Sequence, residues 1–89
     1  MTGAERAALR KQANGLRPIF QIGKDEISDN MIKSVDEALE KRALIKLSLL
    51  ESAAVSAAEA AERLAGATGA EIIQCIGRKF VLYRAPREA

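Results

Sequence analysis

Apolar side chains recur along this chain with two different spacings, and the spacing distinguishes helices from strands. Near the N-terminus, Leu9, Ala13 and Leu16 are separated by four and then three positions, which places them on one face of a helix. Gly15 adds a stop signal at the end of this pattern. The sequence therefore predicts a helix over residues 4–14.

A short strand is predicted after this helix. The residue before a proline is pushed out of helical geometry, so the Arg17-Pro18 pair breaks any continuation. The residues from Ile19 to Ile22 are mostly apolar and end at Gly23, which is typical of a short strand.

A second helix is predicted from Ser28, which is placed to cap it, to about Lys41. Its apolar side chains recur every three to four positions, as one buried face of a helix requires: Met31, Ile32, Val35, Ala38 and Leu39. The polar side chains between them are expected to face water: Asp29, Lys33, Asp36, Glu37 and Glu40.

The segment from Leu44 to Leu50 has the other spacing. Apolar Ile45, Leu47 and Leu49 alternate with polar residues, and a period of two predicts a strand with one fully buried face.

The C-terminal half combines one helix with two strands. Ser56 and Glu59 match a capping box that opens an alanine-rich helix to about Ala67, and Gly69 ends it. Two strands are then predicted, joined by a hairpin at Gly77-Arg78-Lys79: residues 71–76 and 80–84.

The predicted order of elements is α-β-α-β-α-β-β, which indicates an α/β fold. Right-handed crossovers are nearly universal, so two parallel crossovers in succession place both of their helices on one face of a sheet. We therefore expect a four-stranded mixed sheet with helices mainly on one face.

Size and composition limit the number of domains. The chain has 89 residues, of which 48% are hydrophobic and 29% charged, a balance typical of a folded protein. A second domain would have too little apolar surface for its own core, so we expect a single domain over residues 1–89. Residues 85–89 are expected to form a frayed tail.

Charge is segregated along the chain, although the net charge is only +2. Basic blocks alternate with acidic ones, and the basic blocks form a patch if the fold brings them together. The net charges are +4 over residues 1–24, −5 over 25–40, +3 over 41–50, −3 over 51–71 and +3 over 72–89.

The sequence offers little for catalysis or metal binding. It has no histidine and one cysteine, which excludes imidazole chemistry, an internal disulfide and the usual zinc sites. Cys75 lies in an apolar, strand-like run, so we expect a buried and inert thiol. The acidic residues between 29 and 40 have the spacing of a solvated helix face rather than of convergent ligands. We expect neither an enzyme nor a bound cofactor.

Nothing in the sequence predicts contact with a membrane. No apolar run approaches the roughly 20 residues that cross a bilayer. The first residues lack the apolar centre of a signal peptide. We therefore expect a cytoplasmic protein.

Four segments combine distinctive residues: Leu9–Ala13 (LRKQA), Pro18–Lys24 (PIFQIGK), Ala43–Leu47 (ALIKL) and Ile76–Arg84 (IGRKFVLYR). Together they resemble the CRM domain, whose name stands for chloroplast RNA splicing and ribosome maturation, and whose free-standing bacterial form is the YhbY-type protein. The resemblance spans about residues 9–84, and its last segment is the most specific.

This resemblance implies an RNA-binding fold similar to the C-terminal domain of translation initiation factor three. Bacterial members are associated with precursors of the large ribosomal subunit, and plant relatives with group II intron splicing. We therefore expect a protein that binds ribosomal RNA during large-subunit maturation, with a monomer as the default state. The alternative is a protein–protein adaptor on ribosomal precursors, in which the acidic residues 25–40 contact a basic ribosomal protein.

The loop after the first predicted strand carries the sharpest hypothesis. The family's loop usually reads Gly-Lys-x-Gly, analogous to the Gly-x-x-Gly loop of KH domains. Gly23 and Lys24 match it, whereas Glu26 stands at the second glycine, where a carboxylate repels phosphate. Gly23 permits a tight turn, and a helix that opens near Ser28 presents unpaired N–H groups to a phosphate. The alternative from the residues alone is that the acids merely complement the helix dipole.

Other basic residues are candidates for phosphate contacts, which need no strict geometry. A solvated helix face, a charged turn and a charge that protects a strand edge are alternative explanations for them. The three aromatic residues are too few for a base-stacking surface, so we expect RNA to be bound through its backbone and shape. Besides Gly23 and Lys24, the candidates are Arg6, Arg10, Lys11, Arg17, Lys46, Arg78, Lys79 and Arg84.

Overall fold

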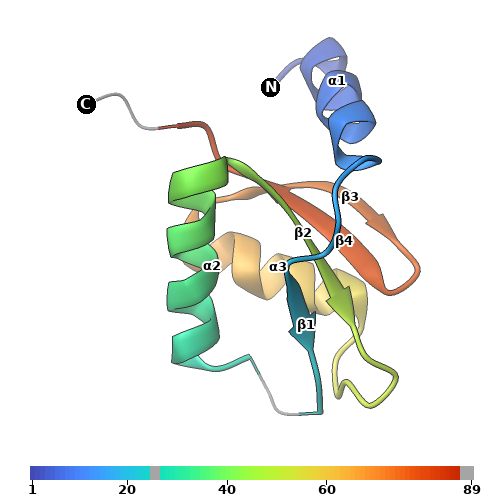
Figure 1. Ribbon diagram of the computed structural model, residues 1–89, viewed down its shortest axis with the longest axis vertical. Helices are drawn as coiled ribbons and strands as arrows, with labels where there is room; N and C mark the ends of the chain where they lie inside the picture. The colour runs from blue at the N-terminus through green and yellow to red at the C-terminus, as the bar shows by residue number, and fades with distance from the viewer. Residues whose placement is uncertain (25–26, 87–89) are drawn as a thin grey trace.

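A computed structural model of the protein describes residues 1–24 and 27–86. The predicted order of helices and strands is confirmed (Figure 1). The elements are α1 (Gly3–Ala13), β1 (Phe20–Ile22), α2 (Asp29–Arg42), β2 (Leu44–Leu49), α3 (Ala57–Thr68), β3 (Glu71–Ile76) and β4 (Lys79–Tyr83).

The strands form one mixed sheet in the order β1-β2-β4-β3. β1 and β2 are parallel and are joined through α2, whereas β4 is antiparallel to both of its neighbours. β3 therefore runs in the same direction as β2, and α3 connects them across β4. This arrangement confirms the predicted four-stranded mixed sheet.

The sequence signals at the helix ends act as expected. The Ser28 hydroxyl accepts a hydrogen bond from the N–H of Met31 at 3.1 Å, and the Ser56 hydroxyl does the same for Glu59. Gly69 ends α3 in the left-handed conformation, at φ +75°, which a glycine adopts without strain.

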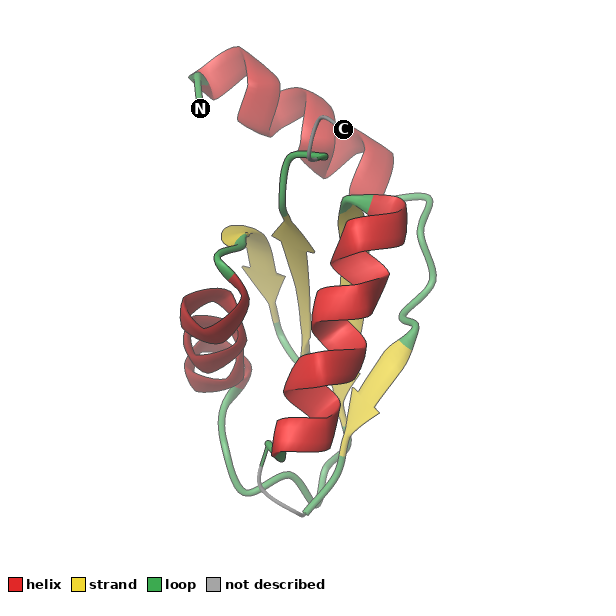
Figure 2. Ribbon diagram, turned by 90° about the vertical axis from the view of Figure 1, so that its left-hand side faces the viewer, coloured by secondary structure: helices red, strands yellow, loops and turns green. Residues whose placement is uncertain are grey.

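The main core lies between the sheet and the pair of helices α2 and α3, which cover one face together (Figure 2). Leu47 is at the centre of this face, paired with Phe20 on β1 and Phe80 on β4, and it is completely buried. The predicted burial of alternate residues along β2 is confirmed, and Phe80 belongs to the core as expected.

The helix α1 packs on the opposite face of the sheet, over one end of it. A second, smaller cluster forms there, and it leaves the rest of that face uncovered by helices. Its members are Ala13, Ile73 and Val81, with Leu9, Leu44 and Tyr83 packed against them. In Figure 1, α1 lies at the upper end of the molecule and the loops after β1 and β2 lie at the lower end.

The prediction that Cys75 is buried is wrong. β3 has an irregularity in which Ile72 pairs with Leu82 and Gln74 with Val81, so Ile73 is an extra residue in the strand. Such a bulge changes which face the following side chains point to. Cys75 then pairs with Phe80 on the helix-covered face, but at the edge of the sheet, where it is exposed.

The last hairpin differs slightly from its prediction. Its turn consists of Gly77 and Arg78, and Gly77 adopts a φ of +59°. The final strand begins at Lys79 and ends at Tyr83, so Lys79 is in the strand and Arg84 follows it. Over the described residues, no helix is long and apolar enough to cross a membrane.

Candidate functional site

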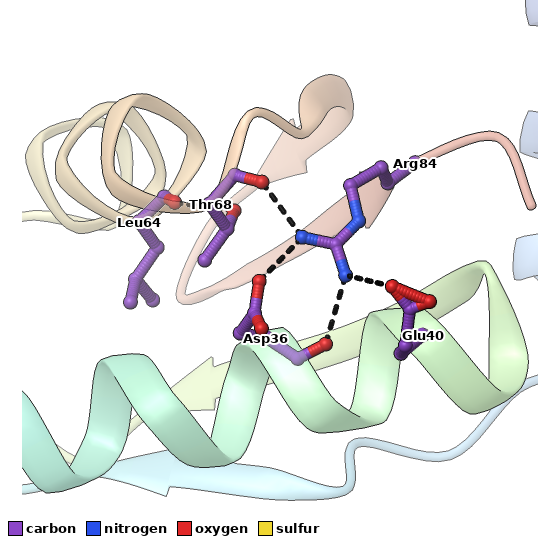
Figure 3. A network of polar contacts seen from close by, with 5 residues as sticks. All are labelled: Asp36, Glu40, Leu64, Thr68 and Arg84. Carbon is purple, nitrogen blue, oxygen red and sulfur yellow. Dashed lines mark hydrogen bonds and ion pairs between the residues drawn. The ribbon is translucent and has the colours of Figure 1, made fainter. Parts of the chain in front are cut away.

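Arg84 is the basic candidate whose position differs most from expectation. Its side chain is only 11% exposed and points toward the space between α2 and α3 (Figure 3). One guanidinium nitrogen donates to the Asp36 carboxylate at 2.5 Å and to the Thr68 carbonyl at 2.7 Å. The other donates to the Asp36 carbonyl at 3.0 Å and lies 3.6 Å from the Glu40 carboxylate.

These contacts make Arg84 a structural residue, because its donors are directed at oxygens of the protein itself. With only 11% of its side chain exposed, little of Arg84 is accessible to RNA, and its predicted RNA contact stays a prediction. Asp36 and Glu40 face water in part, as expected, with side chains about half exposed, but both also pair with Arg84, which the sequence did not predict. The hydroxyl of Thr68 donates to the Leu64 carbonyl at 2.7 Å, which completes the network in α3.

Arg6 also has partners within the protein. It donates to the carbonyl of Ile72 at 2.7 Å and lies 3.7 Å from the Glu71 carboxylate. The contact with Ile72 falls at the bulge in β3, so Arg6 fastens α1 to the irregular part of that strand. The side chain remains 38% exposed, and the exposed ion pair adds little to stability.

The predicted loop follows β1 directly. Lys24 is exposed, and α2 begins a few residues later with its Ser28 cap. Gly23 does not have a positive φ, and a Cβ there would meet the nearest atom, Leu50 Cδ1, at an ordinary distance of 3.7 Å. The backbone conformation and the space at this position therefore do not require a glycine. Glu26, with its predicted effect on phosphate, lies outside the described residues.

Two backbone hydrogen bonds bring other loops to the same end of the sheet as Gly23. The N–H of Leu50 donates to the Ile22 carbonyl at 2.9 Å, and that of Leu49 donates to the Arg78 carbonyl at 2.7 Å. The Gly-Lys loop and the tip of the β3–β4 hairpin therefore share this end. The Arg78 side chain pairs with Glu51 at 3.2 Å, and both side chains are exposed.

The basic residues of α1 lie elsewhere. Arg10 and Lys11 are exposed, but α1 packs at the opposite end of the sheet from the Gly-Lys loop (Figure 1). The structure thus does not collect all predicted residues into one patch.

A third set of basic residues lies around two hollows that share Lys46. Lys46 borders a hollow of about 130 Å³ with Arg17 and Arg42, and a second hollow of about 180 Å³ with Lys79. Among the described residues, none that lines either hollow is acidic. We call these four residues the central basic group. The sequence did not single out Arg42, because a basic residue in the last turn of a helix is ordinary.

The described residues include no group of three or more histidine, cysteine, aspartate or glutamate side chains that could hold a metal ion. All buried side-chain nitrogen and oxygen atoms of the described part have a hydrogen-bond partner. The polar features that stand out are thus the surface cations rather than a reactive centre.

Comparison with known proteins decides the family. The model of the CRS1/YhbY (CRM) domain matches residues 1–84, which includes every helix and strand. The chain belongs to the CRM family. This confirms the resemblance seen in the four sequence segments, and it extends the match through α1 to the N-terminus.

Individual CRM relatives align with nearly the whole length of this chain. The Probable RNA-binding protein YqeI of Bacillus subtilis is 42% identical over 88 residues, which are 99% of this chain and 92% of that protein. The Probable RNA-binding protein MJ0652 of Methanocaldococcus jannaschii is 39% identical over 99% of this chain and 66% of its own length. The solution structure of SAV1595 from Staphylococcus aureus has a TM-score of 0.80 at 44% identity, covering 99% of this chain and 92% of that one.

Proposed function

We propose that this CRM protein is a non-enzymatic, cytoplasmic RNA-binding protein that contacts ribosomal RNA in precursors of the large ribosomal subunit. Two relatives that match nearly the whole chain are named as RNA-binding proteins, and neither name refers to a reaction. The observation that carries the proposal is the central basic group, because four cations lie around two hollows that no acidic residue of the described ranges 1–24 and 27–86 lines. Such a surface attracts the RNA backbone whatever its sequence.

The Gly-Lys loop supports the same proposal. Neither the backbone angle of Gly23 nor the space around it demands a glycine for the fold. Because Gly23 has no side chain, the surface beside Lys24 is open. Backbone can approach a ligand closely at such a position. The start of α2 lies next along the chain, where N–H groups and the helix dipole favour an anion.

The alternative function, a protein–protein adaptor, depends on the acidic segment 25–40. The structure weakens this alternative, because Asp36 and Glu40 already pair with Arg84. Fewer carboxylates of the segment are then available for a basic partner protein.

The proposal predicts that the protein co-sediments with immature large-subunit particles more than with mature ribosomes. Immunoblots of sucrose-gradient fractions from cells with slowed assembly test this. Detection only in the free soluble pool at low salt would rule out the ribosomal target. A salt titration of purified protein on precursor ribosomal RNA separates the two functions, because only the neutralisation of phosphates predicts a steep loss of affinity with salt.

A substitution in the loop tests how RNA is held. Lys24→Glu replaces an attraction by a repulsion near the start of α2, so we expect RNA affinity to fall by roughly tenfold at low salt. Lys33→Glu is the matched control, since it makes the same charge change at an exposed position within α2. Fluorescence anisotropy at fixed salt measures both. An equal loss in the two variants would mean that only net charge matters.

Glu26 gives the complementary change. Glu26→Gly removes a negative charge and restores the usual loop sequence of the family, so we expect tighter binding. Glu37→Gln is a suitable control because Glu37 is exposed and removing its charge leaves the Arg84 network in place. If both variants gain affinity equally, the loop has no special role, and the central basic group is the better candidate.

A further inference from the structure

The face of the sheet opposite α2 and α3 has a part that α1 does not cover, and the strand register shows which side chains share it. Two rows run across this open face. In the first, Lys46 pairs with Val81 and Val81 with Gln74. In the second, Gln21 pairs with Ser48, Ser48 with Lys79 and Lys79 with Ile76. Directly paired residues have side chains on the same face, so these seven form one surface.

The bulge in β3 places two of these seven side chains on this surface. If β3 had no bulge, strict alternation after Ile72 would place Gln74 on the helix-covered face and Cys75 on the open one. With it, Gln74 and Ile76 both reach the open face. Arg6 bonds the Ile72 carbonyl at this irregularity, which holds the bulge in place. Bulges often re-aim side chains in this way beside functional sites.

The composition of this face is unusual for solvent-facing strand positions. Ile76 is 65% exposed, more than any other large hydrophobic side chain among the described residues. It borders the hollow of about 180 Å³ whose other lining residues are Lys46, Gln74, Lys79 and Val81. The hollow therefore offers one exposed apolar side chain, one amide and two cations, while Val81, only 2% exposed, lies beneath them.

These groups match the parts of one nucleotide. The exposed apolar side chain of Ile76 suits the flat face of a base, and an amide such as Gln74 both donates to and accepts from base edges. Two lysines at one hollow suit the phosphates on either side of that base. No carboxylate from the part of the chain that the structure describes lines it, and a carboxylate would repel a phosphate.

We propose that this hollow binds one unpaired nucleotide of the RNA, with the base on the exposed side chain of Ile76, above the nearly buried Val81, the base edge at Gln74 and the flanking phosphates at Lys46 and Lys79. The inference rests on the proposed RNA-binding function and deepens it, because it names the class of RNA. A base in a duplex has its faces stacked and cannot enter, so the site selects loops, bulges and single strands. Lys46 also borders the hollow with Arg17 and Arg42, which gives the backbone a basic path away from the site.

Nuclear magnetic resonance on the intact chain tests the site directly. The probes are a short single-stranded RNA of mixed sequence and a blunt duplex of the same composition, each added to isotope-labelled protein. A base on the floor of the hollow shifts the methyl signals of Ile76 and Val81 upfield through its ring current. We expect these shifts, and a change at the side-chain amide of Gln74, with the single strand and not with the duplex.

Substitutions give a second readout. Gln74→Ala and Ile76→Ala should each weaken single-strand binding by at least about fivefold and leave duplex binding unchanged. Ile76→Leu, which keeps the apolar surface, should bind nearly as well as the parent. Lys79→Gln should weaken binding and lower its salt dependence, whereas Lys33→Gln on exposed α2 should have a smaller effect. Melting curves identify any variant that loses affinity by unfolding.

The outcomes separate this inference from the function on which it rests. If RNA binds but the Ile76 and Gln74 signals do not move, the nucleotide site is wrong and RNA binding stands. Equal shifts with single strand and duplex also overturn the site, because only phosphates are then contacted. If the same signals move instead with a ribosomal protein and not with RNA, the open face is a protein-docking surface. Absence of any RNA binding at low salt overturns both proposals.

Discussion

Leu47→Ala is expected to lower the free energy of unfolding by about 2–5 kcal/mol, the cost of removing a large side chain from a tightly packed core. Leu47 is completely buried, and it lies between Phe20 and Phe80 on the sheet face that α2 and α3 cover. The neighbouring backbones are fixed by the sheet, so the space cannot close. Small domains have total stabilities of about 5–15 kcal/mol, so this loss is a large share of the total.

Thermal or urea denaturation measures this effect, and Leu50→Ala provides the matched control. It removes the same atoms from a side chain that is 44% exposed, just beyond the end of β2. We expect it to lose less than half as much stability, because fewer buried contacts disappear. Equal losses for the two variants would contradict the packing of β2 described above.

Much of this fold could be predicted because its signals are local. The hydroxyl of Ser28 or Ser56 reaches only three residues along the chain, and Gly69 acts on its own backbone angle. The alternation along β2 is equally local, since the backbone of a strand alone sends successive side chains to opposite faces. Signals of this kind are present in the sequence whatever the rest of the chain does.

The bulge in β3 has no comparable signal. Whether Ile73 is an extra residue depends on how β3 pairs with β4, which is a property of two segments together. The apolar run around Cys75 predicted a buried thiol, and strict alternation gave no reason to expect Ile76 on an open face. The fold of this region was predictable, but the side-chain directions were not.

In the candidate site, too, the sequence predicts some features and only the folded structure shows the others. The sequence identifies the basic residues but not their partners, because an arginine at the surface and one in an internal network look alike in a sequence. Arg84 contacts Asp36, which lies 48 residues away. Conversely, Arg42 joins Arg17 and Lys46 only through the folded arrangement of α2, β2 and the segment before β1.

The Arg84 network leads to the second large prediction. Arg84→Met keeps most of the apolar stem and removes every donor, so the carbonyls of Asp36 and Thr68 lose this hydrogen-bond partner. Hydrogen bonds from a charged group are worth about 1.5–3 kcal/mol each, and breaking a fully buried ion pair costs about 3–5 kcal/mol. The two carboxylates are about half exposed, which lowers the electrostatic part. We expect a loss of about 2–4 kcal/mol in the free energy of unfolding.

Three variants distinguish this structural role from the RNA contact that the sequence alone predicted. Arg84→Lys keeps the charge, but a single ammonium group cannot donate to the oxygens of both α2 and α3. It should therefore recover only part of the stability that Arg84→Met loses. Lys79→Met is the control, because it removes a cation from an exposed position on β4 and should leave the melting temperature nearly unchanged. RNA affinity should show the opposite order at a temperature where all variants are folded: Lys79→Met should weaken binding, whereas Arg84→Met should bind as the parent does. A strong loss of RNA affinity in folded Arg84→Met, with unchanged stability, would mean that Arg84 contacts RNA directly.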